Sequence, residues 1–118
     1  MVYKNADIQK LEILKDNKNK SGIYGWINSS NGNSYVGSST NLSRRLLQYF
    51  NTKYLLKYPN FIICKALIKQ GYSNFSLEII EYCDSDKCLE REQYYLDLLN
   101  PKYNILKIAG STLGFKYS

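Results

Sequence analysis

One carboxylate in this chain lies where acidic side chains are costly. On a helix with about 100° between successive residues, Glu92 falls inside the apolar arc formed by Leu89, Leu96 and Leu99, whereas Glu90 falls outside it. A carboxylate on a buried stripe destabilises the fold unless it is paired with a cation or binds a metal ion. The pattern therefore favours two uses of Glu92 about equally: a metal ligand, or one half of a salt bridge to Lys or Arg.

Two adjacent arginines are separated by the same helical geometry. Arg45 lies at the rim of an apolar stripe and can reach inward, whereas Arg44 faces away and should be solvated. A guanidinium at such a rim is suited to bind a phosphate through two parallel hydrogen bonds. The alternative is that Arg45 pairs with Glu92 and has no part in catalysis. The stripe consists of Leu42, Leu46, Tyr49 and Phe50.

The chain contains no histidine, which removes the commonest general base and excludes Ser-His, Cys-His and His-zinc chemistry from this chain alone. Tyr24 and Tyr35 carry phenols, which act as acid or base only if their pKa is lowered or a metal or phosphate assists. Aromatic residues in strands more often serve packing. On the residues alone, a structural role for both tyrosines is favoured.

These side chains need elements to position them, and the first half of the chain predicts a helix followed by a hairpin. The apolar spacing predicts a helix over Ala6–Asn17, with its buried face formed by Ile8, Leu11 and Leu14. Period-two alternation then predicts a strand over Gly22–Asn28. Asn31 and Gly32 form the strongest short hairpin signal, and they predict a return strand over Ser34–Gly37.

The second half predicts two more helices on either side of a polar loop, then a strand and a last helix. Together with the hairpin, these elements predict an α+β fold in which helices flank a small three-stranded antiparallel sheet. The first of these helices is expected from the caps Ser39–Asn41 to about Phe50, followed by a polar loop over 51–60 and a helix over about Phe61–Gln70 that ends at Gly71. A strand is expected over Phe75–Tyr82, and a helix of about 14 residues from Asp84–Asp86 to before Pro101. An extended segment over Tyr103–Ile108 and a tail over Gly110–Ser118 without a clear element complete the chain.

Length and charge limit the classes of protein. The chain has 118 residues, which fits one domain, and its net charge of +6 suits a polyanion such as nucleic acid. No apolar run approaches the roughly 20 residues that span a bilayer, and no secretory signal is recognised near Met1. Three cysteines without a Cys-x-x-Cys pair argue against a disulfide framework or a zinc site. We therefore expect an intracellular protein with reduced thiols.

The order of short motifs resembles one family. Gly22-Ile23-Tyr24, followed after ten residues by Tyr35-Val36-Gly37, resembles the two-part signature of the GIY-YIG nucleases. The resemblance continues at the family's arginine with Arg45, at its acidic helix with Glu92, and at its closing motif with Asn104. It covers about Ser21–Ile105, and several motifs in order at matching spacing make it specific.

The resemblance implies a metal-dependent nuclease that acts on double-stranded DNA and has no small-molecule substrate. It implies that Glu92 binds Mg²⁺ or Mn²⁺, that Arg45 stabilises charge on the phosphoryl oxygens, and that Asn104 orients neighbouring groups. Some members carry a histidine after the arginine; because this chain has none, Tyr24 or Tyr35 is the expected base. Products with 5′-phosphate and 3′-hydroxyl ends are implied. The residues expected to contact the substrate are Gly37, Arg44, Tyr49 and Tyr58.

The strongest similarity is to homing endonucleases encoded by group I introns of fungal mitochondria, which implies a mitochondrial location. The expected organisation is a helix and connector over residues 1–20, a nuclease domain over 21–108, and a tail over 109–118 that resembles the start of a separate DNA-targeting region. Three alternatives stay open: a non-catalytic nucleic-acid-binding domain on the same fold, a partner-docking module, and a repair or restriction nuclease of the same superfamily.

Overall fold

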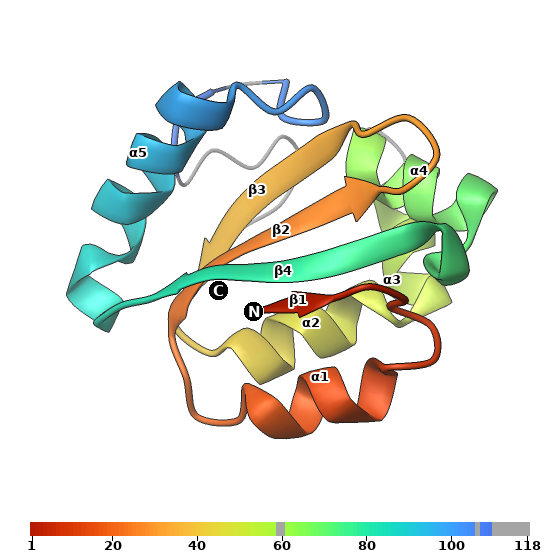
Figure 1. Ribbon diagram of the computed structural model, residues 1–118, viewed down its shortest axis with the longest axis horizontal. Helices are drawn as coiled ribbons and strands as arrows, with labels where there is room; N and C mark the ends of the chain where they lie inside the picture. Colours follow the sequence, from red (N-terminus) through yellow and green to blue (C-terminus); the bar gives the residue numbers. More distant parts are fainter. Residues whose placement is uncertain (59–60, 106, 110–118) are drawn as a thin grey trace.

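Four antiparallel strands form the sheet in the part of the chain that the computed structural model describes, residues 1–58, 61–105 and 107–109. Their order is β1-β4-β2-β3, so β3 is an edge strand and β2 lies between β3 and β4 (Figure 1). The strands are β1 (Val2–Tyr3), β2 (Gly22–Asn28), β3 (Ser34–Ser39) and β4 (Phe75–Tyr82).

The expectation of three strands was wrong because β1 contains only two residues, too few to show a period-two pattern. Val2 pairs with Glu78 and Tyr3 pairs with Leu77. Tyr3 is buried, and the backbone N–H of Ile79 donates to the carbonyl of Met1 over 2.8 Å. The N-terminus therefore extends the sheet on the side away from β3.

The hairpin was predicted correctly, and it fixes which side chains face each other. Gly32 adopts φ of 76° in the turn, a conformation that favours glycine. The resulting register pairs Trp26 with Tyr35 and Tyr24 with Gly37. β3 continues to Ser39, two residues beyond the predicted end.

Helices cover both faces of the sheet (Figure 1). One face packs Tyr24 and Trp26 against the first four helices, and the other packs Ile23 and Val36 against Leu96 of the last helix. The helices are α1 (Lys10–Asp16), α2 (Leu42–Tyr49), α3 (Thr52–Lys57), α4 (Ile62–Gln70) and α5 (Cys88–Leu99), and short 3-10 turns cover Tyr72–Asn74 and Ser85–Lys87.

Several boundaries differ from the expectations. The first helix begins at Lys10, and its buried side chain is Ile13, while Ile8 and Leu11 are exposed. The expected loop over 51–60 contains α3, and the described residues of the expected extended segment 103–108 form turns and bends. The expectation for the tail at 110–118 lies outside the described residues.

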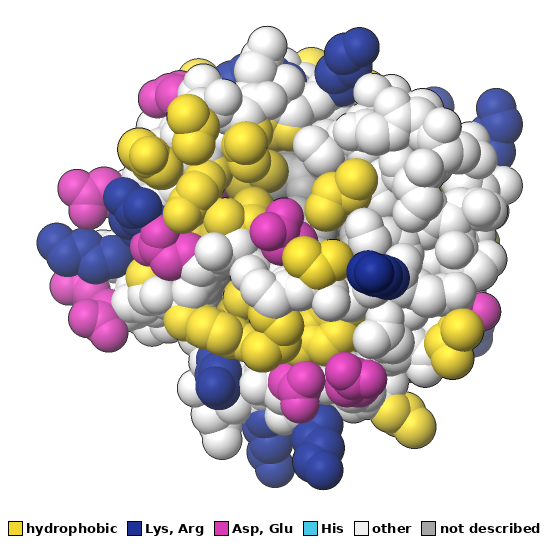
Figure 2. All heavy atoms as spheres, viewed as in Figure 1, with side chains coloured by type: hydrophobic (Ala, Val, Ile, Leu, Met, Phe, Trp, Pro, Cys, Tyr) yellow, Lys and Arg dark blue, Asp and Glu magenta, His cyan; other side chains and the backbone are white. Residues whose placement is uncertain are grey.

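On the face drawn in Figure 2, most Lys and Arg side chains lie near the outline and one lies well inside it, so this face has no large cationic patch. No helix in the described ranges has the length and apolar character needed to cross a membrane.

Candidate active site at the edge of the sheet

Tyr24 and Gly37 form the centre of the site. A Cβ atom on Gly37 would lie 2.6 Å from the Tyr24 Oη and 2.7 Å from its Cζ, so the phenol rests directly on the glycine. Gly37 has an ordinary strand conformation, and its role is therefore steric rather than conformational. This contact explains why a glycine opposite the tyrosine is needed in the hairpin.

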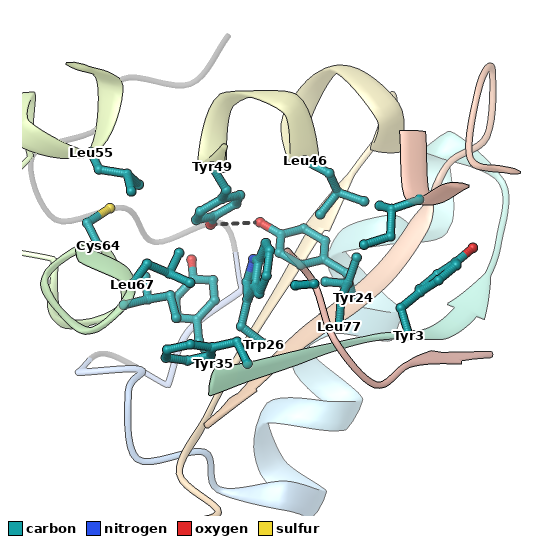
Figure 3. Packing of buried hydrophobic residues seen from close by; sticks show 14 of the residues in the cluster. Tyr3, Tyr24, Trp26, Tyr35, Leu46, Tyr49, Leu55, Cys64, Leu67 and Leu77 are labelled. Carbon is teal, nitrogen blue, oxygen red and sulfur yellow. Dashed lines mark hydrogen bonds between the residues drawn. The ribbon is translucent and has the colours of Figure 1, made fainter. Parts of the chain in front are cut away.

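Tyrosine hydroxyls converge beside this pair (Figure 3). The hydroxyls of Tyr24 and Tyr49 lie 3.0 Å apart in a hydrogen bond, and the two rings meet edge to face. Tyr35 comes from β3 into the same buried cluster. Burial raises the pKa of both Tyr35 and Tyr49 well above the ordinary value, so both phenols stay protonated near neutral pH.

Arg45 projects from α2 beside these phenols. Its Nη1 donates to the Tyr54 hydroxyl over 2.7 Å and to Gln48 Oε1 over 3.0 Å, and its guanidinium lies 5.2 Å from the centre of the Tyr49 ring. Burial lowers the pKa of Arg45, but the phenols of Tyr49 and Tyr24 outweigh it and hold the pKa above its usual value. The side chain is therefore a fixed cation. Its half-buried position agrees with the rim geometry, as does the exposure of Arg44.

Tyr54 and Gln48 are site residues that the sequence analysis missed. Tyr54 lies on α3, which was expected to be a loop. The signal was available in Asn51, whose side chain accepts hydrogen bonds from the backbone N–H groups of Lys53 and Tyr54 and so begins the helix. Gln48 lies three residues after Arg45, within reach on the same helix.

Glu92 lies on the opposite side of the sheet, on α5. Its side chain is 7% exposed, and the Ser38 hydroxyl of β3 donates to its Oε1. The side chain of Glu90 is 72% exposed. The helical geometry therefore distinguished the two acids correctly. Ser38 was not among the expected site residues, because the packing of α5 on β3 joins positions far apart in the chain.

Asn104 is attached to the outer edge of β3. Its Nδ2 donates to the carbonyl of Val36, and its Oδ1 accepts from the backbone N–H of Val36, each over 2.9 Å. Its amide thus pairs with β3 as a further strand would, on the residue between Tyr35 and Gly37. The Lys107 ammonium donates to the carbonyl of Asn104. This position suits a residue that orients its neighbours.

The edge strand β3 joins the two halves of the site. Because alternate side chains point to opposite faces of a strand, Tyr35 faces the cluster that includes α2, while Val36 and Ser38 face α5. The pKa of Tyr35, raised mainly by burial, is also affected by the charges of both Arg45 and Glu92. A cation on the α2 face and a carboxylate on the α5 face therefore lie on the two sides of β3.

The oxygen atoms of Glu92 and Ser38 suit a divalent cation whose other ligands are waters and substrate phosphates. Among the described residues no group of three or more His, Cys, Asp or Glu side chains could hold a metal. Glu92 and Ser38 nevertheless offer a carboxylate and a hydroxyl side by side. Mg²⁺ is commonly bound by one or two carboxylates together with waters and substrate phosphates. Glu92 is therefore the carboxylate on which such a site would depend.

The remaining expected contact residues lie around this centre. Tyr58 follows α3, and its ring packs on Tyr54, 5.1 Å between centres. An open hollow of about 580 Å³ begins at Gln48 and includes Lys10 and Lys53 in its wall. Gln48, which accepts from Arg45, is thus also part of the wall of this hollow.

Comparisons with known proteins agree with this geometry. The family model of the GIY-YIG catalytic domain matches residues 20–104. A probable intron-encoded endonuclease bI1 of Neurospora crassa is 32% identical over 115 residues, which cover 91% of this chain and 25% of the relative. A probable intron-encoded endonuclease 1 of the same organism is 35% identical over 115 residues, which cover 90% of this chain and 36% of that relative.

A solved structure shows the same fold. The catalytic domain of the homing endonuclease I-TevI matches with a TM-score of 0.61 and 32% identity, over 74% of this chain and 99% of that one. The chain thus corresponds to a nearly complete solved domain, while it spans about a quarter to a third of the two Neurospora crassa relatives.

Proposed function

The chain belongs to the family of GIY-YIG catalytic domains, and from this premise we propose that it cuts double-stranded DNA by hydrolysing phosphodiester bonds. One observation carries the proposal: Arg45 lies beside the phenols of Tyr49 and Tyr54 on one side of the edge strand β3, and Ser38 of β3 holds Glu92 on the other side. If Arg45 and Glu92 formed only a structural salt bridge with each other, both side chains would be expected on the same face of the sheet. A phosphodiester needs a cation for its oxygens and a carboxylate that can hold a metal ion.

Arg45 is proposed to bind the phosphoryl oxygens and to stabilise their charge in the transition state. Donors that are held in place before the reaction stabilise developing charge most effectively. The hydrogen bonds from Nη1 to Tyr54 and Gln48 support this role, because they fix the guanidinium from two different helices.

Glu92 and Ser38 are proposed to hold Mg²⁺ or Mn²⁺. When bound, such an ion supplies Lewis-acid stabilisation to the oxygens of the scissile phosphate. The Ser38 hydroxyl orients the carboxylate by donating to it. Asn104 is proposed to keep β3, and with it Ser38, at a fixed distance from the substrate.

Of the two candidate tyrosines, Tyr24 is proposed to position the attacking water. The choice of Tyr24 over Tyr35 rests on the contacts of its hydroxyl. The Tyr24 hydroxyl is shared with Tyr49 and rests on Gly37 at the strand edge. In-line attack by water with departure of the 3′ oxygen leaves 5′-phosphate and 3′-hydroxyl ends.

DNA binding by this domain is proposed to be weak and to depend on the phosphate backbone. Arg44, Lys10 and Lys53 are suited to phosphate contacts, which position DNA without reading its sequence. The modest net charge of +6 supports modest affinity. Choice of target is proposed to belong to a separate DNA-targeting region, and a mitochondrial location belongs to the same proposal, supported by the intron-encoded relatives.

Plasmid nicking tests this function. Supercoiled DNA is incubated with the protein in Mg²⁺, in Mn²⁺ and in EDTA. We expect nicked circles with either metal and none in EDTA, and we expect DNA ligase to reseal the nicks, because ligase needs a 5′-phosphate beside a 3′-hydroxyl. DNA binding without nicking under all three conditions would instead support a non-catalytic binding domain.

A further inference from the structure

Two thiols touch each other at the junction between β4 and α5. The Sγ atoms of Cys83 and Cys88 lie 3.8 Å apart. Cys83 directly follows β4 and is half-buried, whereas Cys88 is the first residue of α5 and is 4% exposed. The third cysteine, Cys64, is fully buried on α4 in the cluster on the other face of the sheet. The chain therefore carries one adjacent thiol pair and one separate thiol as an internal reference.

This pair borders the carboxylate half of the site. Cys88 Sγ contacts the carbonyl of Ser39 at 3.7 Å, next to the Ser38 that binds Glu92. Glu92 lies one turn further along α5, on the same side of the helix as Cys88. Burial, together with the Cys83 thiol and the charge of Glu92, raises the pKa of Cys88 to about 11. A change at Cys88 therefore acts on the start of the helix that carries Glu92.

We propose that Cys83 and Cys88 form a redox-sensitive dithiol site, which small disulfides such as glutathione disulfide close into an intramolecular disulfide that slows DNA cutting. The existence of the site depends only on the geometry of the two thiols. Its effect on cutting rests on the proposed function.

The chemistry balances as two thiol–disulfide exchanges. The Cys83 thiolate, the more accessible of the two, attacks one sulfur of glutathione disulfide, which forms a mixed disulfide and releases one glutathione thiolate. The Cys88 thiol then loses its proton to solvent, and its thiolate attacks the Cys83 sulfur and releases the second glutathione. Two protein thiols are oxidised, and one glutathione disulfide is reduced to two glutathione thiols.

The geometry favours an internal bond over a bond between chains. A disulfide has a sulfur–sulfur distance of about 2.05 Å, so the two Sγ atoms must approach from 3.8 Å, and closing the bond draws the start of α5 towards the end of β4. The bond would replace the contact of Cys88 with the Ser39 carbonyl. The first turn of α5 would then be held to the end of β4, and Glu92 would move with it relative to Ser38.

Mass spectrometry after oxidation tests the site without any nuclease assay. The protein is incubated with glutathione disulfide, denatured, and alkylated with iodoacetamide. We expect loss of two hydrogen atoms and one alkylated thiol, on Cys64, where the reduced chain has three. Retention of three alkylated thiols, stable mixed disulfides, or disulfide-linked dimers would overturn the dithiol site.

Plasmid nicking by the same samples tests the effect. We expect the oxidised form to cut about tenfold more slowly, since an ångström-scale misplacement of a catalytic group can cost about a hundredfold, and dithiothreitol to restore the rate. Cys83→Ser and Cys88→Ser should each cut at the reduced rate with or without oxidant, whereas Cys64→Ser should respond as the original chain does. A disulfide that leaves the rate unchanged would overturn the effect. If no form nicks DNA, the proposed function fails, and so does the effect, while the mass measurement still decides the dithiol site.

Discussion

Replacing Gly37 with alanine should destabilise the fold and displace Tyr24. The added Cβ would lie 2.6 Å from the Tyr24 Oη and 2.7 Å from its Cζ, distances that packed carbon atoms do not reach. The ring is 1% exposed, so it cannot move aside into solvent. Overpacking of this kind costs about 1–3 kcal/mol, which corresponds to a drop in melting temperature of about 4–12 °C for a domain of this size. Cutting should fall about a hundredfold if the phenol moves by about 1 Å.

Gly25→Ala is the matched control within the same sheet. Its Cβ would lie 3.4 Å from Ile80 Cδ1, an ordinary contact with a side chain. Urea unfolding followed by the fluorescence of Trp26, the single tryptophan, measures both variants. A Tyr24→Leu background removes the ring, and there Gly37→Ala should lose most of its cost, which gives a coupling free energy of about 1–3 kcal/mol.

A loss of stability in Gly37→Ala no larger than that in Gly25→Ala would refute the steric role of Gly37. That role is also refuted if the cost of Gly37→Ala is the same with tyrosine and with leucine at position 24, because the contact of the ring with the glycine would then carry no free energy.

Three further perturbations test neighbouring parts of the account. Arg45→Ala should lower the single-turnover cutting rate far more than DNA affinity, whereas Arg44→Ala should weaken DNA binding modestly at any sequence. Equal losses in rate and affinity for Arg45→Ala would show that Arg45 only docks the DNA. Tyr54→Phe should lower the cutting rate by about tenfold with unchanged affinity, since it removes one hydrogen bond that holds the guanidinium, and an unchanged rate would show that this bond is dispensable. Hydrogen bonds from Arg91 and Tyr95 lower the pKa of Glu81, so the ionised carboxylate should stabilise the fold above its ordinary pKa, and this stabilisation should be lost as the pH falls through the lowered pKa. Glu81→Gln should therefore reduce stability to urea at pH 7 but not at pH 2. An equal reduction at both pH values would contradict the assignment.

Helical geometry predicted the burial of Glu92 and the exposure of Glu90, and turn chemistry predicted the hairpin, better than either predicted the elements around them. The distinction between Glu92 and Glu90 needed only the angle between residues on one helix, and the pairing of Tyr24 with Gly37 follows from a tight turn centred near Asn31. Both depend on local rules. The resemblance to a known family then selected Arg45 over Arg44 and Glu92 over Glu90, as helical geometry had, whereas the residues alone had favoured a structural role for Tyr24 and Tyr35.

The missing parts depend on contacts between distant segments. β1 is too short to show a pattern, and its pairing with β4 joins residues more than 70 positions apart. Ser38 meets Glu92 only because α5 packs on β3. Tyr54 was missed for a different reason: the polar residues around it concealed a short helix that Asn51 begins.

The most direct test of the central claim compares Glu92→Gln with Glu90→Gln in single-turnover cutting of DNA with Mg²⁺. Glu92→Gln should cut at least about a hundredfold more slowly and should keep the circular dichroism spectrum of the original chain, because glutamine keeps the shape of the side chain. Glu90→Gln should cut at the original rate. Equal cutting by the two variants would contradict the assignment of Glu92 as the carboxylate on which the site depends.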